Sequence, residues 1–184
     1  MSSDMPNNDS VTVPVWIAAL RTVSRALGVF SAGLILLSIG VICQMVFIRT
    51  VLGQSSIWQT EFVTFAIIAA TFLGAPYILL TKGHVAVDIV PLMVRQPARK
   101  ALHFGGMLIA LIFCGFFLWG AVPWWYETFE SGQTTPSIWQ PRVWIAYSTV
   151  PIGLAVLCLE LIAEIYLVAV DRQMPFGLSH TDTL

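Results

Sequence analysis

Four long apolar runs dominate this sequence. They cover about residues 26–48, 57–80, 101–126 and 143–170, and the first of them contains no charged residue. An α-helix needs about 20 apolar residues to cross the hydrocarbon core of a bilayer, and each run reaches that length. None of the runs alternates polar and apolar residues as a strand of a membrane β-barrel must. We therefore predict an all-α integral membrane protein with four transmembrane helices and short interfacial helices.

The composition excludes most soluble classes of protein. Hydrophobic residues make up 57% of the chain and charged residues 10%, with a mean hydropathy of +0.81, whereas soluble domains are about 25% charged. The net charge is −1 and the basic residues form no patch, which argues against a nucleic-acid partner. We expect one membrane domain over residues 13–170, between a polar leader (1–12) and a polar tail (171–184).

The basic residues also predict an orientation. If both termini are cytoplasmic, all but two of the nine Lys and Arg residues fall in cytoplasmic segments, where such residues are enriched. The two exceptions, Arg49 and Arg142, lie in the expected outer loops, 49–56 and 127–142. The second of these loops is flanked by tryptophan and tyrosine residues, which are typical of a membrane interface. The sequence thus predicts that both termini are cytoplasmic.

Two short helices are expected outside the spans. Val13, Trp16, Ile17 and Leu20 have helical spacing, so we interpret residues 13–25 as a separate interfacial helix; the alternative is that they extend the first span. In the inner loop Asp88 has the position of a helix N-cap, which predicts a surface helix over about residues 89–95 that ends at Pro97.

The sequence offers little chemistry. It has no C-x-x-C pair and no phosphate-binding loop, and its three cysteines lie singly in apolar runs, where we interpret them as small hydrophobic residues. We therefore predict no enzyme activity, and no cofactor, metal or substrate site within the chain. Three carboxylates lie inside predicted spans, and such groups are function candidates by default. Glu61 is near the outer end of span two, and Glu160 and Glu164 are one turn apart near the inner end of span four.

We expect these carboxylates to form ion pairs between helices or subunits rather than a proton relay. Glu61 should lie level with Arg49 and Arg142, and the Glu160/Glu164 face level with Arg21 and Arg25. Span two also carries small residues four apart at Ala66, Ala70 and Gly74. Such a stripe favours close approach of another helix, in this chain or in a partner.

Several weak motifs occur together in a fixed order. In chain order they are Arg49, Trp58-x-x-Glu61, Gly83-His84-Val85-x-Val87-Asp88, Thr135-Pro136, Pro141-x-x-Trp144, Pro151-x-Gly153 and Glu160. Over about residues 20–170 this set resembles the small membrane subunit, of the DctQ type, of tripartite ATP-independent periplasmic (TRAP) transporters.

The resemblance implies a heteromeric transporter in the bacterial inner membrane. A periplasmic binding protein would capture an organic acid or related solute, and a large membrane subunit of the DctM type would carry it inward with sodium by an elevator movement. The small subunit would be a brace with no sodium or substrate site. Its motif residues, together with Glu164, would then serve stability or contact partner subunits and lipids. Asp88 could equally be a plain helix cap.

Two other functions compete with this one. A self-assembling four-span, proton-coupled transporter would need a carboxylate deep in a span, and Glu61 is too close to the end of its span. A membrane anchor of an oxidoreductase would be expected to carry histidines within its spans, and the sequence places none well inside one.

Overall fold

The computed structural model describes residues 14–53, 57–81, 96–137 and 139–170 of the chain. Their helices are α1 (Val15–Val51), α2 (Trp58–Leu80), α4 (Gln96–Ser131), α5 (Val143–Tyr147) and α6 (Thr149–Ala169). Four helical segments, with α5 and α6 counted together, are long and apolar enough to cross a membrane. The predicted all-α, four-span class is therefore confirmed.

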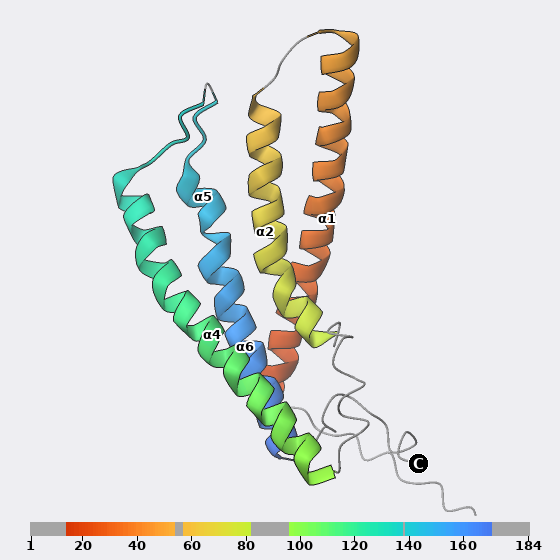
Figure 1. Cartoon of the computed structure of the whole chain (residues 1–184), viewed down its shortest axis with the longest axis vertical. Helices are drawn as coiled ribbons and strands as arrows, with labels where there is room; N and C mark the ends of the chain where they lie inside the picture. Colours follow the sequence, from red (N-terminus) through yellow and green to blue (C-terminus); the bar gives the residue numbers. More distant parts are fainter. Residues whose placement is uncertain (1–13, 54–56, 82–95, 138, 171–184) are drawn as a thin grey trace, which may run out of the picture.

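The spans stand in a row rather than in a closed bundle. Helix α2 packs against α1 on one side and α6 on the other, and α4 packs against α6, so the order across the molecule is α1, α2, α6, α4 (Figure 1). In the most apolar stretch of the α5–α6 span 44% of the residues are buried, against 6% in α4. Helix α6 is thus central, and much of α1 and α4 faces outward.

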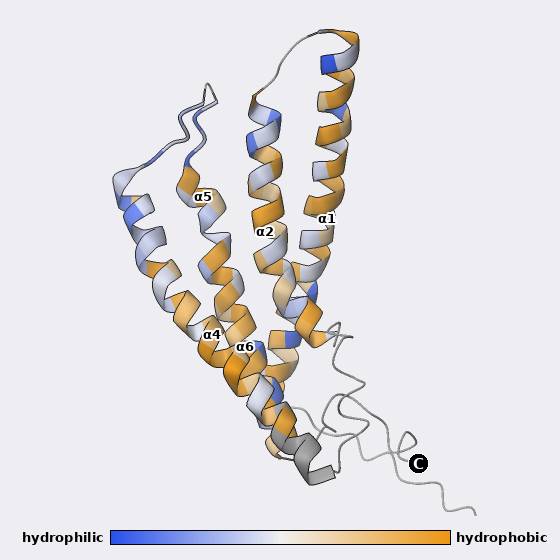
Figure 2. Cartoon of the chain, viewed as in Figure 1, coloured by the Kyte–Doolittle hydropathy of each residue, from blue (hydrophilic) through white to orange (hydrophobic). Residues whose placement is uncertain are grey.

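The two ends of the row differ from its middle. We call the end that carries the α1–α2 connection and residues 132–142 the outer end, and the end where α1 begins and α6 finishes the inner end (Figure 1). Hydrophilic residues gather near these ends, and hydrophobic residues fill the length between them (Figure 2). This distribution is the one expected for helices that cross a bilayer.

Small residues set the distance between α1 and α2. A Cβ atom added at Gly74 of α2 would contact Ser31 of α1, and one added at Gly28 of α1 would overlap the ring of Tyr77 of α2. Nearer the outer end, the hydroxyl of Thr60 reaches the sulfur of Met45. Between these contacts the two helices advance by equal numbers of residues in opposite directions, so they form a regular antiparallel hairpin. The predicted stripe of Ala66, Ala70 and Gly74 is buried, and at Gly74 it faces α1.

A close backbone contact joins α6 to α2. A Cβ atom added at Gly153 would overlap the backbone carbonyl of Phe72. That carbonyl is the one that loses its helical partner, because residue 76 is a buried proline without an N–H group. Gly153 therefore allows α6 to lie against a part of α2 whose backbone Pro76 has altered. Around this contact, Ala121 of α4 and Val150 and Leu154 of α6 form a buried cluster with Ile68 and Phe72 of α2 packed against it.

A second proline divides the fourth span. Helix α5 ends at Tyr147 and α6 begins at Thr149, with Ser148 between them. Pro151 cannot donate a hydrogen bond to the carbonyl of Tyr147, and this explains the break at that point. Pro151 itself lies in the first turn of α6, where a missing N–H group costs little.

The structure corrects two predicted helix boundaries. Residues 15–25 are not a separate interfacial helix but the first turns of α1, which at 37 residues is about 55 Å long; the alternative of an extended first span is the right one. Pro97 does not end a helix but lies in the first turn of α4, a position that tolerates proline. The surface helix predicted over residues 89–95 lies outside the described residues.

The contact at Gly153 gives a direct test of the packing. We expect Gly153→Ala to lower the free energy of unfolding by about 1–3 kcal/mol, because the new methyl group must push α6 away from α2. Gly115 of α4 is the matched control, since nothing lies within 4 Å of a Cβ added there. Gly115→Ala should raise stability by up to about 1 kcal/mol through helix propensity alone. Equal melting temperatures of the two variants in detergent would contradict the packing described.

Candidate functional site

The outer end of the row is closed by a short hairpin. Thr134 and Arg142 form an antiparallel bridge, and the N–H of Val143 donates to the carbonyl of Gln133 over 3.2 Å. The N–H of Thr135 reaches the carbonyl of Pro141 over 3.4 Å. These bonds hold the described residues of the segment 132–142 in a defined shape between α4 and α5. We call this segment the outer hairpin.

Glu61 fastens the outer hairpin to α2. Its Oε2 atom accepts hydrogen bonds from the hydroxyl of Ser137 over 2.9 Å and from that of Thr135 over 3.2 Å. Glu61 lies in the first turn of α2, where the helix dipole favours a negative charge. The carboxylate therefore has three favourable interactions and links segments more than 70 residues apart in sequence.

These partners differ from the expected ones. Arg49 and Arg142 do lie at the outer end, but within the described part of the chain neither guanidinium forms an ion pair with Glu61. Both arginines are exposed. Within the described residues the partners of Glu61 are hydroxyl groups, because the outer hairpin folds over α2 and brings Ser137 and Thr135 to it. An ion pair between Glu61 and a partner subunit stays a prediction.

Tryptophan side chains complete the outer end. Trp58, the first residue of α2, meets Trp139 of the hairpin edge to face, with ring centroids 6.4 Å apart. The indole N–H of Trp125 on α4 donates to the carbonyl of Trp144 over 3.1 Å. The ring of Trp144 packs at 5.1 Å from that of Phe129. Trp58 and Trp144 thus tie α2, the hairpin, α4 and α5 together, and we call this assembly with Glu61 the outer clasp.

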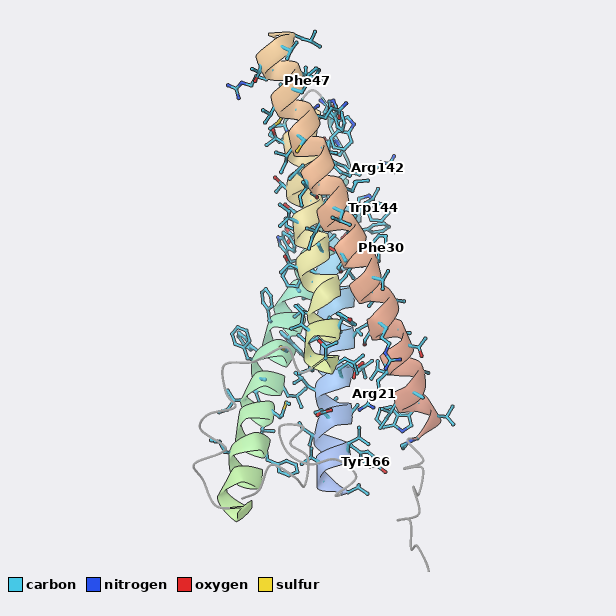
Figure 3. All side chains as sticks on the ribbon, turned by 90° about the vertical axis from the view of Figure 1, so that its right-hand side faces the viewer. Arg21, Phe30, Phe47, Arg142, Trp144 and Tyr166 are labelled. Carbon is cyan, nitrogen blue, oxygen red and sulfur yellow. The ribbon has the colours of Figure 1, made fainter. Side chains whose placement is uncertain are left out.

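The inner end has its own polar contact. Ser24 of α1 donates a hydrogen bond of 2.5 Å to Oε1 of Glu160 on α6, and both residues are buried. Below them Ile17, Ala163 and Leu167 form an apolar cluster, and Trp16 packs against Tyr166. In Figure 3, Arg21 lies between α1 and α6 towards this end, with Tyr166 beyond it. The contact joins α1 directly to α6, although α2 separates the two helices farther out.

The second inner carboxylate faces the expected arginines. Glu164 lines a polar pocket together with Arg21 and Arg25. The prediction that the Glu160/Glu164 face lies level with these arginines is therefore confirmed, while the direct hydrogen-bond partner of Glu160 is the hydroxyl of Ser24. A serine in the segment that precedes the first apolar run gives no sign in sequence of the carboxylate it will meet.

Sequence reasoning missed two groups of residues. Ser24, Ser31 and Ser38 are seven residues apart and all buried on one face of α1, and this spacing was a readable signal of a packing face. Gln59 is 1% exposed, and its side-chain amide makes no hydrogen bond in the described regions. Its neighbours Trp58 and Thr60 are exposed. The burial of Gln59 therefore follows from the face of α2 on which it lies, and the sequence around it gives no sign of that face.

The remaining predicted residues fall into two sets. Gly153 and Pro151 act within the chain, at the α2 contact and at the α5–α6 break, and the carbonyl of Pro141 closes the outer hairpin. His84 and Asp88 lie outside the described residues. In the part that the structure describes, no three His, Cys, Asp or Glu side chains are grouped as metal ligands. The predicted site residues that the structure describes therefore form contacts between helices.

An apolar groove of about 490 Å³ lies between α2, α4 and α6. Phe72, Phe116, Phe117, Trp124 and Tyr147 are among its lining residues. The polar pocket, in contrast, is confined to the inner end, at Arg21, Arg25, Tyr77, Thr81 and Glu164. Neither cavity leads from one end of the row to the other.

Comparison with known proteins gives one family. The family model described as "Tripartite ATP-independent periplasmic transporters, DctQ component" matches residues 38–170. Among curated proteins, the C4-dicarboxylate TRAP transporter small permease protein DctQ of Rhodobacter capsulatus is 22% identical over 135 residues, which are 73% of this chain and 55% of that protein. The chain thus spans about half the length of the curated relative it matches. No solved structure matches it.

The outer clasp can be tested through amide exchange. Replacing Thr135 and Ser137 together by alanine removes both hydrogen bonds to Glu61, and bonds to a charged group contribute about 1.5–3 kcal/mol each. We expect the amides of Thr135 and Val143, which are bonded across the hairpin, to exchange with deuterium about tenfold faster or more. Ser131→Ala is the control, because that hydroxyl bonds only to carbonyls of its own helix. Unchanged exchange in the double variant would show that Glu61 does not hold the hairpin.

Proposed function

The chain belongs to the DctQ family of tripartite ATP-independent periplasmic (TRAP) transporter components, and from that premise we propose that it braces a larger membrane subunit without itself carrying substrate. Members of this family are transporter components and not enzymes. The transporter would depend on a periplasmic binding protein and on sodium, with the sodium and substrate sites in the large, DctM-type subunit.

The row of helices is the observation that carries this proposal. A carrier must enclose its substrate between helices near the middle of the membrane. Here the four spans stand side by side, the groove between α2, α4 and α6 is apolar, and the polar pocket lies at one end. The same geometry supports a brace, because a row presents two broad apolar faces. Exposed residues on α4 such as Ile109, Phe116 and Trp119 would contact lipid or the large subunit.

The two fastened ends support the same function. The outer clasp and the Ser24–Glu160 bond connect α2 to the α4–α5 hairpin at one end and α1 to α6 at the other. A subunit that supports a moving partner should keep its own helices fixed, and these contacts resist sliding of α1–α2 past α4–α6. Neither of the competing functions, proton-coupled transport or oxidoreductase anchoring, gains a specific observation.

Orientation and substrate are parts of this proposal. By the distribution of Lys and Arg, the inner end faces the cytoplasm and the protein lies in the bacterial inner membrane. The transported solute would be an organic acid or a related compound. The curated relative is named for C4-dicarboxylates, which belong to that class, and the binding protein would make the choice within it.

Reconstitution tests the proposal. Purified alone in liposomes with a sodium gradient, the chain should take up no organic acid. Uptake should appear only when the large subunit and the cognate binding protein are both added. Substrate-dependent uptake by this chain alone would overturn the proposal in favour of an independent transporter.

The variant Glu61→Gln tests the bracing role of this chain in the reconstituted three-component transporter. The neutral amide keeps the shape of the side chain but weakens the bonds from Ser137 and Thr135, so the large subunit should co-purify less well and the maximal uptake rate should fall. The substrate concentration at half-maximal rate and the sodium dependence should stay unchanged. Glu130→Gln, at an exposed carboxylate of α4, is the matched control. Normal assembly with altered sodium coupling would instead make Glu61 a transport residue.

A further inference from the structure

The polar pocket at the inner end is not used by the contacts described so far. Its volume is about 370 Å³, and it lies where α1, α2 and α6 converge. Its polar lining comes from Arg21 and Arg25 of α1, Tyr77 and Thr81 of α2, and Glu164 of α6. Three helices therefore direct polar groups into one space, which is unusual in a chain with 10% charged residues.

The pocket lies at the depth of lipid headgroups. Helix α2 has 23 residues, a length of about 34 Å, and the hydrocarbon core is about 30 Å thick. Thr81 directly follows its last residue, Leu80, so this end of α2 marks the membrane surface. Gly28 of α1 packs against Tyr77, which places Arg25 about one turn and Arg21 about two turns farther towards the inner end.

Arg21 carries a donor that needs a partner. Its Nε atom is buried and has no hydrogen-bond acceptor among the described residues. A buried N–H group of a guanidinium is costly to leave unpaired, and phosphate oxygens suit the flat, forked geometry of arginine. Arg25, one turn away on the same helix, is exposed and can reach the same anion from the other side.

The charges in the pocket leave room for one negative charge. Two guanidinium groups and the carboxylate of Glu164 line it, which gives a net charge of one positive unit when all three are ionised. Glu160 is not among the residues that line the pocket, and its carboxylate accepts a hydrogen bond from the hydroxyl of Ser24. A phosphodiester carries one negative charge and would bring the pocket to neutrality.

We propose that this pocket binds the phosphodiester headgroup of an anionic phospholipid in the inner leaflet. Arg21 and Arg25 hold the phosphate oxygens, and the hydroxyl of Tyr77 is available as a further donor. Val29 and Leu80 complete the lining, and Val29 is 73% exposed on the outward side of α1. An acyl chain can therefore leave the pocket along α1 into the bilayer. The lipid would fill the gap between three helices, as anionic lipids do in basic pockets between membrane helices. The choice of leaflet rests on the proposed orientation of the chain, whereas the lipid site itself does not depend on the transport function.

Lipid binding to the full chain in detergent micelles tests this site. Delipidated protein is titrated with phosphatidylglycerol or phosphatidylcholine, and bound lipid is measured by native mass spectrometry and by the rise in melting temperature. We expect phosphatidylglycerol to bind at least tenfold more tightly than phosphatidylcholine. The double variant Arg21→Gln/Arg25→Gln should lose that preference. Arg49→Gln/Arg142→Gln removes the same charge at the outer end and should keep it.

Single variants and soluble ligands complete the test. Arg25→Gln changes an exposed side chain, so it should fold normally and weaken phosphatidylglycerol binding about threefold or more, even if the double variant does not fold. Inorganic phosphate and glycerol phosphate at millimolar concentration should neither raise the melting temperature nor displace the lipid. Equal binding of both lipids, equal loss in the two double variants, or full binding by Arg25→Gln would overturn the proposal. Binding of inorganic phosphate at the same arginines would identify a site for a soluble anion instead of a lipid.

Discussion

The contact between Gly153 of α6 and the carbonyl of Phe72 of α2 is the one on which the arrangement of the helices depends. Inside a bilayer, burial of apolar surface does little to bring helices together, because lipid tails are equally apolar. Association then depends on close packing and on hydrogen bonds between helices, and small residues such as glycine let two backbones approach closely. Pro76 leaves the carbonyl of Phe72 without its helical hydrogen bond, and Gly153 packs against that carbonyl. Two residues on different spans thus form this contact together. It joins the α1–α2 hairpin to the α4–α6 pair in the middle of the row, between the outer clasp at one end and the Ser24–Glu160 bond at the other.

Charged residues refine this arrangement without building a pathway. Glu61 and Glu160 are both bonded to hydroxyl groups, one at each end of the row. Hydroxyl partners satisfy a carboxylate without placing a second charge in the membrane, where charges are costly. The outer clasp and the inner contact therefore connect the helices at both ends of the row, and the buried Nε–H of Arg21 has no acceptor among the described residues.

The sequence predicts the four spans well, because bilayer thickness sets the length of a long apolar run. The orientation that the basic residues indicate stays a prediction. The stripe at Ala66, Ala70 and Gly74 was also readable, since small residues at helical spacing have one main use. The continuity of α1 could not be predicted from the sequence. A separate interfacial helix and the extension of a transmembrane helix have the same amphipathic spacing. Nor could the partners of Glu61 be predicted. Depth alone placed it level with Arg49 and Arg142, but the fold of the outer hairpin brings Ser137 and Thr135 to it. The roles predicted for His84 and Asp88 stay predictions, because both residues lie outside the described part of the chain.

The row itself is the central claim, and a distance between its outermost helices tests it most directly. Ile42 of α1 and Tyr126 of α4 are exposed positions towards the outer end. Spin labels would be attached there in a variant without the three native cysteines, with the chain in lipid nanodiscs. Neighbouring helices lie about 8–10 Å apart, so a row with two helices in between predicts about 24–30 Å between the helix axes. An axis separation of about 15 Å or less would mean that α1 and α4 close a bundle, and would contradict both the row and the brace built on it.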